Sequence, residues 1–304
     1  MRFRRLSALV LSAAMVATVP VSAAHAGTKA LKKYPKKPAG ISAQTGYLLD
    51  QTTGKVLWSR KPNTKMQIGS ITKVMTALVV LKAGKLNRKI KITQRHHDYI
   101  DNHGASSAGL VVGDTLTAGQ LVQAMLLESD SAAAYALADA YGPTWKKFIG
   151  KMNAQAKALH LTHTRYDSFD GLNPWWYPNK QWSTAKDQVT LARTAMKYPN
   201  FRNTVAKKQI NVWHTPGGHS YTFDSGNKLL GRYPGMLGIK TGTTGAAGAC
   251  FLFASKNKKH LLYGVVLKST NNRTARFNDT VKILNWAFHL RAKVTVTREQ
   301  ADTA

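Results

Sequence analysis

The segment IGSITKVMTALVV, from Ile68 to Val80, has apolar residues on every side of the helix that its composition predicts. A helix that is apolar all round is buried in the core of a protein. This one nevertheless carries Lys73 three residues after Ser70, and residues three apart lie on the same face of a helix. The sequence therefore predicts a serine and a lysine that share one buried position at the start of a core helix.

Burial gives such a lysine a chemical use. Loss of water disfavours the ammonium ion and lowers the lysine pKa. The neutral amine of Lys73 can then take the proton of the Ser70 hydroxyl and activate it as a nucleophile. Main-chain N–H groups at the helix N-terminus add donors beside the reacting centre. The alternative is a lysine whose amine reaches water along the helix surface and which has no role in chemistry.

The spacing alone is a weak signal, because serine precedes lysine by three residues at other places too: Ser183/Lys186, Ser225/Lys228 and Ser255/Lys258. Those pairs are expected in a helix cap, a loop and a charged turn. Only Ser70 opens a helix of core composition, so the context selects Ser70 and Lys73.

Strand patterns lie on both sides of this helix, towards the two ends of the chain. The segment 46–60 predicts a hairpin, and short strand runs within 235–268 precede a final helix at 274–290. Helical patterns fill most of the region between, roughly 88–210. This order predicts an α+β fold, in which both chain ends build one sheet and a helical lobe is inserted between them.

Two further motifs carry groups that fit the same chemistry. Ser129-Asp130-Ser131 falls between two predicted helices, where a hydroxyl could pass a proton to a leaving group. The alternative for Asp130 is an N-cap of the second helix. Lys240-Thr241-Gly242 lies on a predicted strand, where the lysine favours an anionic substrate and the glycine would let a substrate main chain approach the strand edge.

The ordered motifs Ser-x-x-Lys, Ser-x-Ser and Lys-Thr-Gly resemble those of penicillin-binding proteins and class A β-lactamases. The flanking segments KMNAQAKALHLTHT, STAKD and GNKLLGRYPGMLGIKTGTTGAAG extend the resemblance to the low-molecular-mass serine D-alanyl-D-alanine carboxypeptidases. It covers roughly residues 41–290, which would form the D,D-peptidase domain. The resemblance implies a penicillin-binding protein/β-lactamase-like transpeptidase fold, with an antiparallel sheet, flanking helices and an all-helical lobe at roughly 88–210. It implies no cofactor and no metal.

The resemblance also implies a role for each motif residue. Ser70 would attack the carbonyl between the two D-alanines that end a peptidoglycan stem peptide, Lys73 would take its proton, and Ser129 would protonate the departing D-alanine. Lys240 and Thr241 would hold the terminal carboxylate. The full set expected to bind substrate is Ser131, Lys240, Thr241, Gly242, Thr243 and Thr244, with the N–H groups of Ser70 and Thr243 as the oxyanion hole. β-Lactam antibiotics would acylate the same serine.

Two departures from the family pattern bear on function. Ser131 stands where relatives have asparagine, so we expect looser binding of the substrate main chain. Asn227, in Ser225-Gly226-Asn227, is an alternative that its flanking sequence disfavours. No glutamate lies between Leu159 and Thr204, where a β-lactamase would carry its deacylating residue. A β-lactam acyl-enzyme should therefore persist. A D,D-transpeptidase and a non-catalytic cell-wall-binding homologue remain alternatives.

The N-terminus predicts export. Residues 1–26 read as a secretory signal peptide, with a basic start, an apolar run and the cleavage site Ala24-His25-Ala26. An uncleaved anchor is the alternative, and no other run is apolar enough to span a membrane. Residues 27–40 read as a basic flexible lead-in and 291–304 as a short polar tail. We therefore expect a bacterial protein that is secreted, extracellular or associated with the cell wall.

The charge predicts anionic partners. Removing the three signal arginines lowers the net charge from +30 to +27. Because an exported protein rarely meets nucleic acid, anionic cell-envelope polymers are the expected partners. A solvated basic surface without a partner is the alternative.

Other residues have equally plain interpretations. The single cysteine, Cys250, excludes an internal disulfide and reads as a small buried hydrophobe. The group His96, His97 and His103 has no His-x-x-x-His spacing, so we expect no metal there. The aromatic run Trp175-Trp176-Tyr177 predicts either a cleft rim or the anchor of a long loop.

Overall fold

The structure is a computed structural model that describes residues 36–172, 180–213, 215–289, 293–294 and 296–302. The chain divides into two compact units, Met1–Tyr34 and Pro35–Ala304. Every described residue belongs to the second unit. The predicted signal peptide, most of the predicted lead-in and the run Trp175-Trp176-Tyr177 lie outside the described residues.

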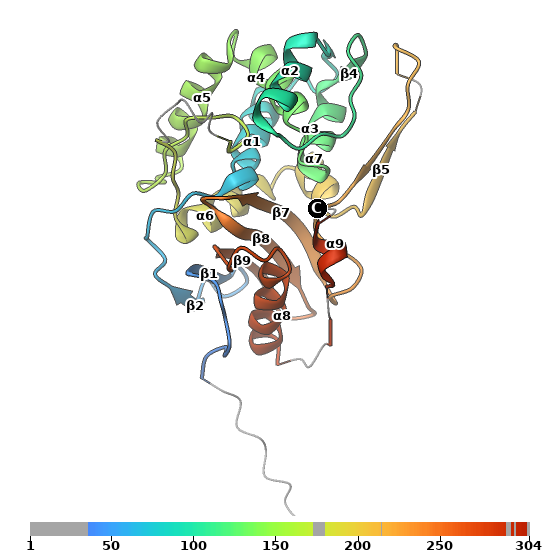
Figure 1. The fold of residues 1–304 in the computed structure, drawn as a ribbon. Helices are drawn as coiled ribbons and strands as arrows, with labels where there is room; N and C mark the ends of the chain where they lie inside the picture. The colour runs from blue at the N-terminus through green and yellow to red at the C-terminus, as the bar shows by residue number, and fades with distance from the viewer. Residues whose placement is uncertain (1–35, 173–179, 214, 290–292, 295, 303–304) are drawn as a thin grey trace, which may run out of the picture. The chain divides into compact units, whose positions relative to one another are not determined.

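Five antiparallel strands form the central sheet, in the order β2–β1–β9–β8–β7 (Figure 1). The strands are β1 (Thr45–Asp50), β2 (Val56–Arg60), β7 (Met236–Thr244), β8 (Gly248–Lys256) and β9 (Leu261–Leu267). β1 pairs with β9, so strands from both ends of the described chain build one sheet, as the sequence predicts. β7 is an edge strand of this sheet and lies next to the helices.

Helices cover the two faces of the sheet because its strands bury side chains on both sides. Phe251 and Phe253 of β8 face α8 (Ala275–Ala287), where Phe251 and Phe277 have ring centroids 5.3 Å apart. The alternate residues Cys250 and Leu252 belong to the other apolar cluster, with α6 (Ala185–Ala195). This alternation follows from the period of two along a strand.

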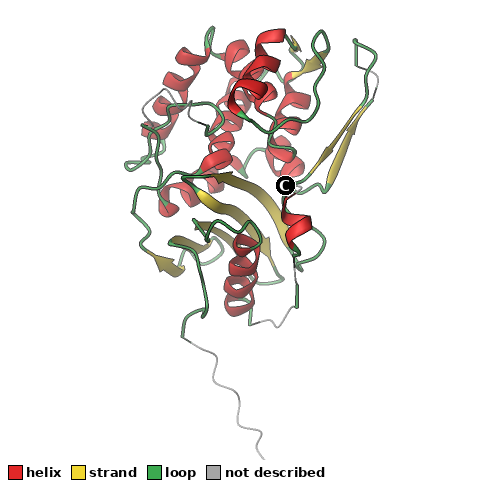
Figure 2. Ribbon diagram, viewed as in Figure 1, coloured by secondary structure: helices red, strands yellow, loops and turns green. Residues whose placement is uncertain are grey.

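Most of the remaining helices gather with α1 on one side of the sheet (Figures 1 and 2). A short 3₁₀ turn, η1 (Gly69–Thr72), leads into α1 (Lys73–Ala83), which is buried on every side from Lys73 to Leu81. The others are α2 (Gln94–His103), α3 (Ala118–Leu127), α4 (Ser131–Tyr141), α5 (Trp145–Ala158) and α7 (Pro199–Val205). The predicted buried helix is thus confirmed, with a tighter first turn than the sequence predicts.

The lobe is not purely helical, which corrects the sequence prediction. Inside it, β3 (Lys89–Lys91) pairs with β4 (Thr115–Thr117). A second pair, β5 (Gln209–Val212) with β6 (Tyr221–Asp224), follows at the predicted end of the lobe. The strands β3 and β4 each bury one residue, Ile90 and Leu116. Three-residue strands of this kind are too short for the alternation of apolar and polar residues to reveal.

The C-terminal segment also differs from the polar tail expected at 291–304. It contains α9 (Arg298–Asp302), and Val296 and Ala301 are buried in the apolar cluster on the α8 face of the sheet. Burial of the apolar side chains Val296 and Ala301 favours packing of this segment against the core. No helix among the described residues is long and apolar enough to cross a membrane.

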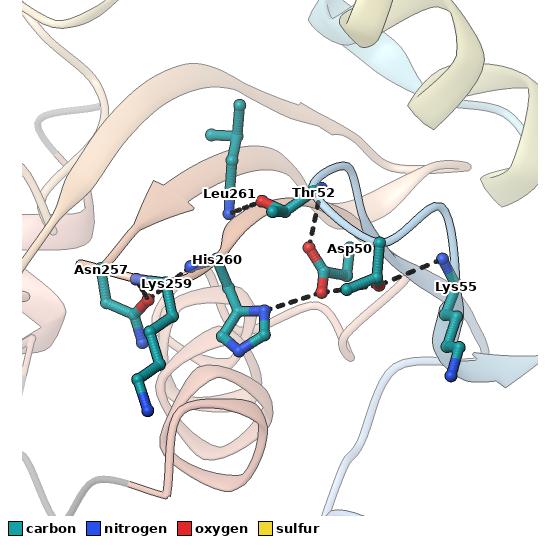
Figure 3. Close-up of polar contacts among 8 residues, drawn as sticks. Asp50, Thr52, Lys55, Asn257, Lys259, His260 and Leu261 are labelled. Atoms are coloured by element: carbon teal, nitrogen blue, oxygen red, sulfur yellow. Dashed lines mark hydrogen bonds and ion pairs between the residues drawn. The ribbon is translucent and has the colours of Figure 1, made fainter.

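A buried carboxylate ties the β1–β2 turn to the β8–β9 turn (Figure 3). Oδ2 of Asp50 lies 2.8 Å from Nδ1 of His260 and accepts a hydrogen bond from Thr53, and Thr52 N donates to Oδ1 at 2.9 Å. Leu261 N in turn donates to Thr52 Oγ1 at 3.0 Å. Burial favours a raised pKa for Asp50, but the hydrogen bonds outweigh it and hold the pKa below its ordinary value.

Candidate active site

The three predicted catalytic side chains meet at the start of α1. Lys73 Nζ lies 3.1 Å from Ser70 Oγ and 3.4 Å from Ser129 Oγ. Lys73 is fully buried, whereas Ser70 and Ser129 each retain 8% exposure. The buried amine therefore lies between the hydroxyl groups of two residues that are slightly exposed.

Burial is the main influence on this lysine. It lowers the pKa of Lys73, while the carboxylates of Asp170 and Asp130 act more weakly in the opposite direction. The net shift favours the neutral amine, which is the form that can accept a proton from Ser70.

Ser129 is held by an unusual turn between α3 and α4. Its φ of 63° lies in the left-handed region, which a residue with a side chain seldom adopts. Asp130 caps α4: its carboxylate accepts from Ala133 N and from Ala108 N, the latter at 2.6 Å. The capping interpretation of Asp130 is thus confirmed, and the cap fixes the position of the serine before it.

Ser131 is the first residue of α4 and is fully buried. Its main-chain N donates to Ser106 O at 3.0 Å, and its hydroxyl has no hydrogen-bond partner among the described residues. The expected contact between Ser131 and substrate stays a prediction.

Gly242 lets β7 pass directly against η1. A Cβ at this position would lie 2.4 Å from Ile68 O, which is closer than real Cβ contacts come, and 3.1 Å from Ser70 N, which is a tight contact. The close neighbour that requires glycine in this structure is therefore the chain's own main chain. The approach of a substrate main chain to Gly242 stays a prediction. A Cβ on Gly69 would likewise meet Thr243 N at 3.1 Å. The main chains of β7 and η1 therefore touch along a line that we call the seam, and the predicted oxyanion donors, Ser70 and Thr243, both lie on it.

Lys240 is a second buried lysine. Its Nζ donates to Thr241 O at 3.3 Å. Burial lowers its pKa well below the ordinary value, the neighbouring charges of Lys73 and Arg276 lower it further, and Glu128 opposes them. Thr241 is buried beside it, whereas Thr244 Oγ1 accepts from Ala247 N at 3.0 Å within the β7–β8 turn.

Arg276 belongs to this site and was not predicted. It is buried in α8, and a guanidinium nitrogen donates to Thr243 Oγ1 at 2.7 Å. The signal in the sequence is an arginine beside Phe277, on the face of the last helix that its apolar residues mark as buried. Because a guanidinium stays protonated, Arg276 gives the site a positive charge near Lys240, which suits a carboxylate ligand.

The remaining residues singled out in the sequence lie in other surroundings. Among the described residues no group of three or more His, Cys, Asp or Glu side chains could hold a metal ion. His96 Nε2 lies 3.3 Å from Asp139 Oδ2. Asn227 Oδ1 accepts from Leu229 N at 3.1 Å, as a local turn contact. Cys250 is buried, and burial raises its thiol pKa to about 11.

These features define an acyl-transfer site of the serine–lysine class. The hydroxyl of Ser70 opens a buried helix, the amine of Lys73 contacts it, and a second hydroxyl and two further cations lie around them. The chain belongs to the D-alanyl-D-alanine carboxypeptidase family, whose profile matches residues 32–271. The predicted resemblance and fold class are therefore confirmed.

Relatives of known sequence support the same assignment. The chain is 36% identical to a D-alanyl-D-alanine carboxypeptidase of Streptomyces sp. strain K15, over 95% of this chain and the whole of that protein. It is 27% identical to the D-alanyl-D-alanine carboxypeptidase DacF of Bacillus subtilis, over 81% of this chain but only 62% of that longer protein.

Solved structures agree with the fold. The crystal structure of the Streptomyces K15 DD-transpeptidase matches with a TM-score of 0.78 and 38% identity, over 84% of this chain and all of that one. Penicillin-binding protein D2 of Listeria monocytogenes, in an ampicillin-bound form, matches with a TM-score of 0.70 and 28% identity, over 82% of this chain and 98% of that one.

Proposed function

We propose that the chain removes the terminal D-alanine from peptidoglycan stem peptides through an acyl-enzyme on Ser70. The observation that carries this proposal is the position of Lys73 Nζ, 3.1 Å from Ser70 Oγ and 3.4 Å from Ser129 Oγ. One neutral amine can thus serve the nucleophile on one side and the leaving group on the other.

The chemistry proceeds in two steps. Lys73 takes the proton of Ser70, whose Oγ attacks the carbonyl of the penultimate D-alanine, while the N–H groups of Ser70 and Thr243 bind the developing oxyanion. Ser129 passes a proton to the departing amine. Water then hydrolyses the ester and restores the serine.

Polar and basic side chains beside Thr243 would select the substrate. We propose that the carboxylate of the terminal D-alanine is held by Lys240, Thr241 and Arg276. A free C-terminal carboxylate is what distinguishes a stem peptide end from an internal peptide bond.

Intact mass spectrometry after incubation with benzylpenicillin tests the proposal. We expect one covalent adduct, mapped to the peptide that contains Ser70. Ser70→Ala should fold and form no adduct. An adduct on another residue, or none on the wild type, would overturn the mechanism.

A D,D-transpeptidase is the second candidate, favoured by the 38% identity to the Streptomyces K15 DD-transpeptidase. The same acyl-enzyme would then transfer to an amine in place of water. Turnover of a D-Ala-D-Ala peptide with added glycine separates the two activities. Carboxypeptidase activity predicts mainly free acid, and transpeptidase activity predicts mainly the glycine adduct.

We further propose that the chain is exported and retained by its charge. The basic start, apolar run and small-residue site within residues 1–26 support cleavage before Gly27, and residues 41–290 would form the catalytic domain. Contacts between a +27 surface and anionic envelope polymers weaken when salt screens them. Molar salt should therefore release the protein from cells, and N-terminal sequencing should begin at Gly27.

A further inference from the structure

The loop that contains Asp170 packs tightly against η1 and α1. Phe169 is buried, its carbonyl accepts from Thr76 Oγ1 at 2.5 Å, and its ring stacks on Tyr135 with centroids 5.0 Å apart. A Cβ on Gly171 would lie 2.0 Å from Gly69 O, so the loop main chain touches the residue before the nucleophile. This packing places Asp170, which lies between the two anchors, in a defined position.

The carboxylate of Asp170 is fully buried, and only one of its two oxygens has hydrogen-bond partners among the described residues. Oδ1 accepts from Leu172 N at 3.0 Å and from the Tyr99 hydroxyl at 3.3 Å. Oδ2 has no hydrogen-bond partner among the described residues. A buried carboxylate oxygen without a partner is costly, so a water molecule is the expected occupant beside it.

A second such oxygen lies on the adjoining segment. Thr72 is fully buried, and its Oγ1 also lacks a partner among the described residues. It lies 3.0 Å from the position that a Cβ on Gly171 would take. Two buried oxygens without a partner, on segments that touch each other at η1, are polar surroundings of the kind that hold an ordered water.

The charge of Asp170 also reaches the reacting centre. Burial lowers the pKa of Lys73, and Asp170 is the carboxylate that opposes this effect most strongly, ahead of Asp130. Asp130 is committed to capping α4, with backbone N–H groups on its oxygens. Asp170 is therefore the carboxylate near Lys73 that has an oxygen available for chemistry.

We propose that Asp170, with Thr72 Oγ1 as a second partner, holds and deprotonates the water that hydrolyses the acyl-enzyme. The water oxygen bonds to the acyl carbon, its proton passes to the Asp170 carboxylate, and the bond from that carbon to Ser70 Oγ breaks. Ser70 regains a proton, Asp170 returns to its charged form, and the free acid leaves with the oxygen of the water. This inference rests on the proposed function, and it assigns to an aspartate the step for which no glutamate is available.

Asp170→Asn tests the assignment, because asparagine keeps the size of the side chain and an acceptor for Tyr99 and Leu172. With a D-Ala-D-Ala peptide we expect kcat to fall about 100-fold, since a positioned general base contributes 10²–10⁴-fold. KM should fall in proportion and kcat/KM should stay unchanged, because kcat/KM reports acylation. The ester on Ser70 should accumulate in intact mass spectra. Hydroxylamine, which needs no base, should restore turnover.

Two other variants complete the test. Asp139→Asn is the matched control, because it removes a carboxylate of the same lobe that pairs with Arg95, and it should leave kcat unchanged. Thr72→Val removes the second partner at little cost to stability, because it deletes a hydroxyl that is buried and unpaired in the described structure. It should slow deacylation about tenfold, and it decides the matter if Asp170→Asn does not fold.

Wild-type kcat in Asp170→Asn or, if that variant does not fold, in Thr72→Val would overturn the inference. So would a parallel loss of kcat and kcat/KM without accumulated ester, since Asp170 would then act on acylation. Failure of the proposed function gives a different result, namely no benzylpenicillin adduct on Ser70 in the wild type.

Discussion

Replacing Gly242 by alanine should misalign the active site without touching a catalytic group. The new Cβ would lie 2.4 Å from Ile68 O, whereas an ordinary carbon–oxygen contact is about 3.4 Å. β7 and η1 must therefore separate by about 1 Å. The separation falls between the main-chain N–H groups of Ser70 and Thr243, and a displacement of about 1 Å can cost about 10²-fold in rate.

The rate constant for acylation by benzylpenicillin, followed by intact mass, measures this effect. We expect Gly242→Ala to acylate about 100-fold more slowly while its unfolding transition shows a folded protein, destabilised by about 1–3 kcal/mol through overpacking. Gly245→Ala is the matched control, because no described atom lies within 4 Å of its Cβ position. Acylation of Gly242→Ala within threefold of the control would refute the argument that this seam sets the geometry.

Three further predictions concern single side chains. Lys73→Arg keeps a basic side chain but should reduce the rate constant for acylation of Ser70 by benzylpenicillin at least about 100-fold, because a guanidinium cannot accept the proton. A wild-type rate constant would show that Lys73 is not the base. Asp50→Asn should lower the free energy of unfolding at pH 7 by about 1–3 kcal/mol. Because the pKa of Asp50 is lowered, its contribution to stability is present above about pH 4 and is lost as the pH falls through that pKa. In urea unfolding, wild type and Asp50→Asn should therefore differ less in free energy of unfolding at pH 3 than at pH 7. An equal difference at both pH values would contradict this. Ser131→Ala should change the free energy of unfolding by less than about 0.5 kcal/mol and kcat/KM by at most about tenfold, because a single neutral hydroxyl is lost; a 100-fold loss would give this residue a larger part in catalysis.

The parts of the fold that rest on local pattern could be predicted from the sequence. The apolar composition of Ile68–Val80 is enough to place α1 in the core, because no surface helix tolerates it. Strand patterns near both ends of the chain are enough to predict that β1 joins the later strands. The pair Ser70 and Lys73 follows from the same buried helix, since its spacing is set by helical geometry.

The parts that depend on contacts between distant segments could not be predicted. The reason for Gly242 is the carbonyl of Ile68, which lies more than 170 residues earlier in the chain. Arg276 reaches Thr243 only because α8 covers the sheet. Asp170 reads as an ordinary loop residue until Phe169 and Gly171 are seen to fix it against α1. Such roles arise from packing, and single-residue patterns carry little information about it.

The two buried lysines of the site differ in their neighbours, and this difference suits the reaction. Asp170 and Asp130 oppose the effect of burial on Lys73, whereas Lys240 faces the cations Lys73 and Arg276. A substrate carboxylate beside Lys240 would offset the charge missing there and favour protonation of Lys240. The carboxylate and the protonated Lys240 would then form a pair without net charge, so burial would remain the main influence on the pKa of Lys73.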